Sequence, residues 1–168
     1  VQARIAAPLE AADIPLYAQH VDGVDTATLI DIFRAEEDAC LLGTDAVRDG
    51  VDVPGRSLRL VVFDRVPWPR PDILYKARAE VFPGGKAAYA DMLTRLRLRQ
   101  AFGRLIRRAT DRGVFVLLDS RLPSRLATAF PDGVPVARLG LAEAVTAVRH
   151  FFAQEKKIHE TSSMESNP

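Results

Sequence analysis

Short apolar runs of strand length alternate along this chain with segments of helical periodicity. The clearest run is Val114 to Leu118, and the same pattern recurs at Leu58 to Asp64 and at Ala39 to Gly43. Thr26 to Glu36 shows helical spacing instead, with its apolar residues on one face, and Asp25 can cap this helix. Wholly apolar strands interleaved with amphipathic helices are typical of a mostly parallel sheet buried between helices. The pattern therefore predicts an α/β fold.

Weaker signals predict the remaining elements. We expect strands at 14–18 and 134–137, helices at 73–81, 87–108 and 141–152, a short helix at 124–129, and the end of a helix at 1–12. The segment 44–55 is rich in Gly, Asp and Pro, which predicts a loop, and the proline-rich segment 66–71 predicts an extended connector. We expect one domain over residues 1–153, and a disordered polar tail over residues 154–168.

Composition excludes several classes of protein. No apolar run approaches the roughly 20 residues of a membrane helix, and the N-terminus lacks a secretory signal pattern, so we expect a cytoplasmic protein without a membrane partner. The single cysteine, Cys40, rules out an internal disulfide and a cluster built on thiolates of this chain alone. His20, His150 and His159 have no partner at ligand spacing, so no metal site is expected. Because the sequence does not begin with Met, we expect a piece of a longer protein.

The basic residues are mostly arginine: 19 of the 23 cations are Arg, and seven of them lie between Arg95 and Arg112. Arginine is suited to bidentate contact with phosphate. The cluster therefore predicts either a phosphate-binding surface or a solvated helix face, and composition does not separate the two.

Within this cluster, the spacing of one predicted helix divides its residues between two faces. Gln100, Gly103, Arg104 and Arg107 fall within about 100° of one another, whereas the apolar residues Leu98, Phe102 and Leu105 point the opposite way. Glycine costs a helix up to about 1 kcal/mol relative to alanine. Its place between arginines indicates that a backbone or a phosphate approaches closely there.

A second polar block, Gly43-Thr44-Asp45 and Gly50 to Gly55, follows a predicted strand, where α/β sheets bind their ligands. The two blocks resemble motifs V and VI of superfamily 2 helicases, and most closely those of the bacterial DinG-type enzymes in the DinG and XPD branch. Three further stretches lie in the order that the resemblance requires: 60–64, Pro67-Trp68-Pro69, and 111–121.

The resemblance implies a RecA-like fold of the P-loop NTPase type, the second of two motor domains in an ATP-dependent DNA helicase. It implies that ATP and Mg²⁺ are shared with a first RecA-like domain of the same polypeptide, and that the partner is single-stranded or forked DNA. This chain lacks a P-loop, since Pro83-Gly84-Gly85-Lys86 has neither the first glycine nor the final Ser or Thr. We therefore expect this chain alone not to hydrolyse ATP. An Fe–S cluster, if the protein has one, is expected outside this chain.

The resemblance also implies roles for individual residues. Arg107 would be the arginine finger on the γ-phosphate, with Arg104 beside it and Gln100 orienting the attacking water. By motif position, the residues that bind the nucleotide would be Gly50, Asp52 and Gly103. The residues that contact the DNA strand would be Thr44, Asp45 and Arg48.

This chain departs from the DinG-type pattern at Val47-Arg48-Asp49, where the bacterial enzymes tend to have Phe-Trp-Glu.

Two other interpretations of the function stay open. One is a non-catalytic DNA-binding or protein-docking module that retained the fold, and the other is a nuclease or CRISPR-associated role decided by additional domains. The intact Gln100, Arg104 and Arg107 favour the motor, because DNA binding alone does not require them. Trp68 either stacks on a base or covers the sheet edge as a hydrophobic plug.

Overall fold

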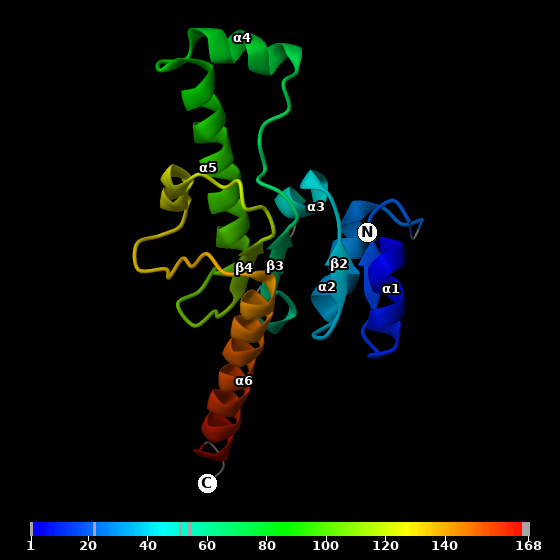
Figure 1. Ribbon diagram of the computed structural model, residues 1–168. Helices are drawn as coiled ribbons and strands as arrows, with labels where there is room; N and C mark the ends of the chain where they lie inside the picture. Colours follow the sequence, from blue (N-terminus) through cyan, green and yellow to red (C-terminus); the bar gives the residue numbers. More distant parts are fainter. Residues whose placement is uncertain (1, 22, 51, 54, 166–168) are drawn as a thin grey trace. The chain divides into compact units, whose positions relative to one another are not determined.

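The computed structural model describes residues 2–21, 23–50, 52–53 and 55–165, except the side chains of residues 48–50 and 155–165. The chain forms two compact units, Val1–Asp132 and Gly133–Pro168. The first unit contains every described strand, arranged as two parallel pairs (Figure 1). β1 (Leu16–Ala18) pairs with β2 (Cys40–Leu42), and β3 (Leu60–Phe63) pairs with β4 (Val114–Leu117).

Parallel strands connected through helices confirm the predicted α/β class, with three differences. The four strands make two separate pairs within the described residues, whereas we predicted one sheet. They are mostly half-buried, and β3 exposes Leu60 and Val62. The strand predicted over residues 134–137 is wrong, since that segment has no regular structure. Pro135 explains the last difference, because proline has no N–H to donate to a neighbouring strand.

The pair β1–β2 carries α1 (Gln2–Glu10) and α2 (Thr26–Ala35), both of which contact β1. Asp25 caps α2 as its sequence position predicts, accepting hydrogen bonds from the backbone N–H groups of residues 27 and 28. The apolar face of α2 is buried in a core cluster that also includes residues from the following segment. That cluster consists of Ile30, Phe33, Val47 and Val53.

Half of the segment predicted as a loop over residues 44–55 is helical, since α3 spans Asp45–Gly50 and a 3-10 turn, η1, spans Gly55–Ser57. Val47 explains the helix, because its side chain is buried in the core cluster beneath α2. Gly43 makes room for it, since a Cβ at position 43 would collide with the Val47 side chain. The valine that replaces the phenylalanine of the DinG-type pattern is therefore a core residue here.

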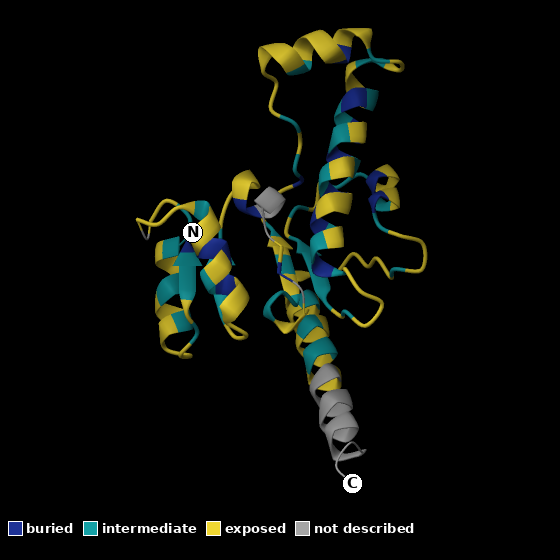
Figure 2. Ribbon diagram, turned by 180° about the vertical axis from the view of Figure 1, so that it is seen from behind, coloured by how far each residue is buried: buried dark blue, intermediate teal, exposed yellow. Residues whose placement is uncertain are grey.

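The pair β3–β4 packs on α5 (Gly85–Leu105), which contacts the preceding helix α4 (Ile73–Val81); α4 lies across the start of α5 (Figure 1). One side of α5 is buried along its length, whereas α4 is exposed along most of its own (Figure 2). Leu98 of α5 and Leu126 of η2 (Ser124–Ala129) are both fully buried. Aromatic rings continue this core between α5, β3, β4 and the residue after η2, in the contacts Phe63–Phe115, Phe115–Phe130 and Phe102–Phe130.

The proline-rich segment 66–71 is extended, as predicted, and two side chains hold it in place. Asp119 accepts the N–H of Val66 at 3.1 Å and also binds the Arg121 guanidinium through both carboxylate oxygens. Hydrogen bonds from Arg121 and Val66 hold the pKa of Asp119 well below its ordinary value. From α5, Arg97 donates to the carbonyl oxygens of Pro67 and Trp68.

The second unit contains α6, which spans Leu141–Glu165. Its backbone is helical across the start of the tail that we expected to be disordered from residue 154, and residues 166–168 lie outside the described part. The contact boundary at Asp132 also differs from the single domain expected over residues 1–153. No helix in the described part of the chain is long and apolar enough to cross a membrane.

Candidate nucleotide and nucleic-acid site

The C-terminal half of α5 has the two faces that its sequence predicts. Leu98 and Leu105 are buried, whereas Gln100 and Gly103 are exposed and Arg104 is half-buried. A Cβ built at Gly103 would meet no atom of the described residues within 4 Å, so the described part of the chain leaves the space beside that glycine open. The fold itself therefore does not require glycine at position 103.

α5 ends at Leu105, three residues before the predicted end, so Arg107 does not share the helical face of Gln100 and Arg104. Asp111 explains the difference. Its Oδ2 accepts the backbone N–H of Arg107 at 2.8 Å and that of Arg108 at 2.7 Å, so neither group continues the helix. These two hydrogen bonds lower the pKa of Asp111 below its ordinary value.

Leaving the helix brings Arg107 to Asp52. Arg107 Nη1 donates to Asp52 Oδ1 in an ion pair that joins the two predicted motifs across 55 positions of sequence. The Arg107 side chain is 24% exposed and that of Asp52 is 60% exposed. Arg34 of α2 fixes the backbone of the same residue, since its Nε donates to the Asp52 carbonyl oxygen at 3.0 Å.

Thr44 lies directly after β2 and is held by Gln19, which directly follows β1. Gln19 Oε1 accepts from the Thr44 backbone N–H at 2.9 Å and from Thr44 Oγ1 at 2.8 Å. The other end of the amide, Nε2, donates to Thr26 Oγ1 in the first turn of α2. The exposed Thr44 is thus fixed to the start of that helix by a residue outside the predicted motifs.

Thr44 and Asp45 lie on an open cleft of about 450 Å³ in the first unit. The other lining residues come from the connector and from α5: Arg70, Asp72 and Arg97. We did not assign Arg70 or Arg97 to a site from the sequence. The available signal was position, because the connector follows the carboxyl end of β3, where sheets of this kind bind ligands.

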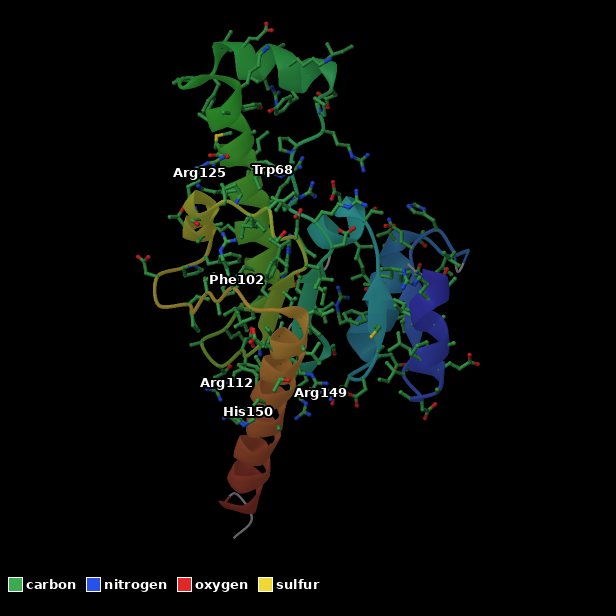
Figure 3. All side chains as sticks on the ribbon, viewed as in Figure 1. Trp68, Phe102, Arg112, Arg125, Arg149 and His150 are labelled. Carbon is green, nitrogen blue, oxygen red and sulfur yellow. The ribbon has the colours of Figure 1, made fainter. Side chains whose placement is uncertain are left out.

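Among the site residues predicted from the sequence, the structure thus brings together two groups: Asp52 with Arg107, and Thr44 with Asp45. Three others, Gln100, Gly103 and Arg104, lie on α5 and belong to neither group. For two further predicted residues, Arg48 and Gly50, the structure does not describe the side-chain environment. Figure 3 shows Trp68 on the connector beside α5, with Phe102 further along that helix. In the part of the chain that the structure describes, no group of three or more His, Cys, Asp or Glu side chains gathers as metal ligands would.

Similarity to the curated relatives covers about two thirds of the chain. ATP-dependent helicase DinG of Mycobacterium tuberculosis is 43% identical over 122 residues, which make up 67% of this chain and 18% of that protein. ATP-dependent DNA helicase YoaA of Escherichia coli is 39% identical over 104 residues, or 58% of this chain and 16% of its own length. A Bacillus subtilis relative named 3'-5' exonuclease DinG is 35% identical over 119 residues, covering 68% of this chain and 13% of its own length.

The matched region spans less than a fifth of each of these three relatives. Residues 1–137 match a protein family described as the helicase C-terminal domain. This match includes both described groups and the cleft. The chain therefore belongs to the helicase C-terminal domain family.

Proposed function

We propose that this chain is the second RecA-like motor domain of an ATP-dependent DNA helicase. In this proposal, ATP binds between this domain and a first RecA-like domain of the same polypeptide, and its hydrolysis drives movement along single-stranded or forked DNA. The observation that carries the proposal is the ion pair between Arg107 and Asp52. It brings the guanidinium group of the predicted motif VI into contact with the carboxylate of the predicted motif V. The names of the DinG and YoaA relatives support the same activity.

Arg107 acts as the arginine finger. Phosphoryl transfer depends mainly on positioning and charge stabilisation, and an arginine supplied across a domain boundary contributes about 10³–10⁵ in rate. Exposed ion pairs contribute only roughly 0–1 kcal/mol, so the pair with Asp52 presents a low barrier to release. The γ-phosphate then replaces the carboxylate as the partner of Arg107, and Asp52 becomes available to the rest of the nucleotide.

The other motif VI residues act from the exposed face of α5. Arg104 adds a second positive charge, and Gln100 orients the attacking water. The open space beside Gly103 admits the nucleotide or the first motor domain, and Gly50 of motif V faces the same nucleotide. Mg²⁺ neutralises phosphate charge when it is bound, and its protein ligands come from the first domain.

Thr44, Asp45 and Arg48 contact the DNA backbone in this proposal. Thr44 lies at the end of β2, close in sequence to Asp52 on the nucleotide side. Its hydroxyl donates to Gln19 Oε1 at 2.8 Å in this structure, and in the proposal it exchanges that acceptor for a phosphate oxygen of the strand. Between them lies α3, which is anchored by the buried Val47. A displacement of α3 would therefore transmit a change in the contacts to the ATP phosphates to the contacts with the phosphates of the DNA strand.

The test compares ATP turnover by the full-length protein with and without single-stranded DNA, and uses this chain alone as the paired control. We expect turnover that rises with DNA in the full-length protein and no turnover by this chain alone. Unwinding of a forked duplex should then depend on ATP. DNA binding without turnover in the full-length protein would contradict the proposal and favour the non-catalytic DNA-binding module.

A further inference from the structure

The cleft beside Thr44 carries two arginines that the motif V and motif VI assignments do not use. Arg70 comes from the connector and Arg97 from α5, and both line the cleft together with Thr44. Neither forms an ion pair with any described side chain, although several other arginines of the chain do. The cleft therefore contains two guanidinium groups that form no ion pair with a described side chain, beside the carboxylates of Asp45 and Asp72.

Arg97 is oriented by the wall of the cleft. Its Nη1 donates to the Pro67 carbonyl at 3.0 Å and to the Trp68 carbonyl at 2.8 Å. Its Nε and Nη2 groups have no acceptor among the described residues, so they are available to a ligand. Because the guanidinium group is already held in place, binding a ligand there costs little side-chain entropy.

Arg70 is held by its backbone instead. It stands between Pro69 and Pro71, whose rings restrict the chain to extended conformations. Its side chain is exposed, and its carbonyl oxygen accepts the N–H of Asp72 at 2.9 Å. The connector thus presents the second guanidinium group to the cleft from a stiff segment.

The two carboxylates of the cleft belong to helix starts. Asp72 is the N-cap of α4, and its Oδ1 accepts the N–H of Tyr75 at 2.7 Å. Asp45 lies in the first turn of α3. The partial positive charge of a helix start offsets an adjacent carboxylate, so these acids reduce the positive charge of the cleft less than their number suggests.

Trp68 adds an aromatic ring beside the cleft. Its carbonyl oxygen accepts a hydrogen bond from Arg97, which lines the cleft, and the residue is 40% exposed on the connector (Figure 3). A tryptophan serving as a hydrophobic plug would be largely buried, so its exposure favours the base-stacking alternative. Aromatic rings next to basic grooves are the usual means by which proteins bind single-stranded nucleic acids without sequence preference.

We propose that Arg70 and Arg97 form a phosphodiester subsite for a single strand of nucleic acid, adjoining Thr44, and that Trp68 stacks on a neighbouring base. This inference rests on the proposed function and extends its DNA contacts from motif V to the connector and the middle of α5. Arg70 and Arg97 set affinity for the strand, and they do not act in the hydrolysis of ATP.

The experiment measures binding of a fluorescent oligothymidine to the full-length protein at several salt concentrations, alongside DNA-stimulated ATP turnover. Arg70→Ala is the cleanest variant, because its exposed side chain forms no hydrogen bond or ion pair with another described residue. We expect a rise in Kd of about tenfold and a decrease of about 0.7 in the slope of log affinity against log salt, the contribution of one phosphate on a single strand. KM for ATP and kcat at saturating DNA should not change.

Two further variants test the geometry. Arg97→Lys keeps the charge and loses the fork, so it should weaken DNA binding without changing KM for ATP. Trp68→Ala should weaken binding several-fold, whereas Trp68→Phe, which retains a ring, should restore most of the affinity. Arg99→Ala is the matched control, since Arg99 is exposed on α5 two positions from Arg97 and therefore on another side of the helix. It should lower affinity far less than Arg70→Ala.

The results separate the two sources of phosphate. An Arg70→Ala variant with raised KM for ATP and unchanged DNA affinity would show that the cleft binds the nucleotide, and this would overturn the inference. DNA affinity equal to that of the wild type, in a protein that shows DNA-stimulated turnover, would overturn it as well. A protein that loses DNA affinity in the Arg70→Ala variant but never hydrolyses ATP would support the subsite and contradict only the proposed motor.

Discussion

Arg107 and Asp52 form an ion pair although 55 positions separate them in sequence. The pair exists because α5 stops at Leu105 and Asp111 takes up the next backbone N–H groups, which turns Arg107 out of the helix. A side chain that follows a helix end can change partners by small backbone rotations, whereas one in mid-helix is restricted to a few rotamers. An arginine finger that must move between a carboxylate and a phosphate suits this location.

Replacing Arg107 by alanine in the full-length protein should leave ATP binding mostly intact and lower DNA-stimulated turnover at least about 100-fold, because the charge on the transferred phosphoryl group is no longer stabilised. Steady-state turnover and nucleotide titration measure the two effects. Arg108→Ala is the matched control, since the backbone N–H of Arg108 binds the same Asp111 oxygen. Near-normal turnover in Arg107→Ala would refute the assignment of the finger.

Gly103→Ala should separate stability from activity. The added methyl group meets no atom of the residues that the structure describes within 4 Å, and alanine is favoured over glycine in helices by up to about 1 kcal/mol. We therefore expect slower amide hydrogen exchange in α5 together with reduced ATP turnover, because the methyl group projects into the space assigned to the nucleotide or the first domain. Unchanged turnover would show that nothing approaches position 103 during hydrolysis.

Gly43→Ala should be destabilising for the opposite reason. Its Cβ would collide with Val47, whose side chain is buried in the core cluster, and overpacking of this kind costs about 1–3 kcal/mol. Urea unfolding followed by tryptophan fluorescence measures the loss. The double variant Gly43→Ala/Val47→Ala supplies the control. It should be more stable than the sum of the two single changes implies, and simple additivity would contradict the collision.

Asp119 should make stability depend on pH in the acid range. Hydrogen bonds from Arg121 and Val66 lower its folded pKa below the ordinary value of 3.8, so its contribution is complete above that value and decreases as the pH falls further. Asp119→Asn should be less stable than the wild type at pH 7, and the difference should shrink below about pH 4. Urea midpoints from pH 7 to pH 3 measure it. A constant difference over this range would exclude the ionised carboxylate as the cause.

The sequence predicted the elements whose local pattern agrees with their packing. These elements depend on residues that lie close together in the sequence. They are the cap at Asp25, the strands β3 and β4, and the buried face of α5. Local patterns missed the end of α5, because the carboxylate that competes for its N–H groups belongs to Asp111, beyond the helix. They also missed α3, which depends on a core that Val47 shares with the distant residues of α2.

Part of the candidate site could likewise be predicted from local sequence, and part could not. Motif positions pointed to Arg107 and Asp52, although nothing local indicated that the two would form an ion pair. Arg97 was predicted only as part of the arginine cluster, and Arg70 not at all, because their cleft is assembled from segments that are about 25 positions apart. Only the fold brings the connector, α5 and the end of β2 together.

The amide of Gln19 uses both of its ends, since its oxygen accepts two hydrogen bonds from Thr44 and its nitrogen donates to Thr26. Glutamate at position 19 would lose the N–H donor to Thr26. A hydrophobic residue there would remove all three hydrogen bonds, the two from Thr44 and the one to Thr26. A change at position 19 therefore affects the contacts of both Thr26 and Thr44. In related sequences, the identities at positions 19, 26 and 44 should covary, and a substitution at one should be accompanied by changes at the others.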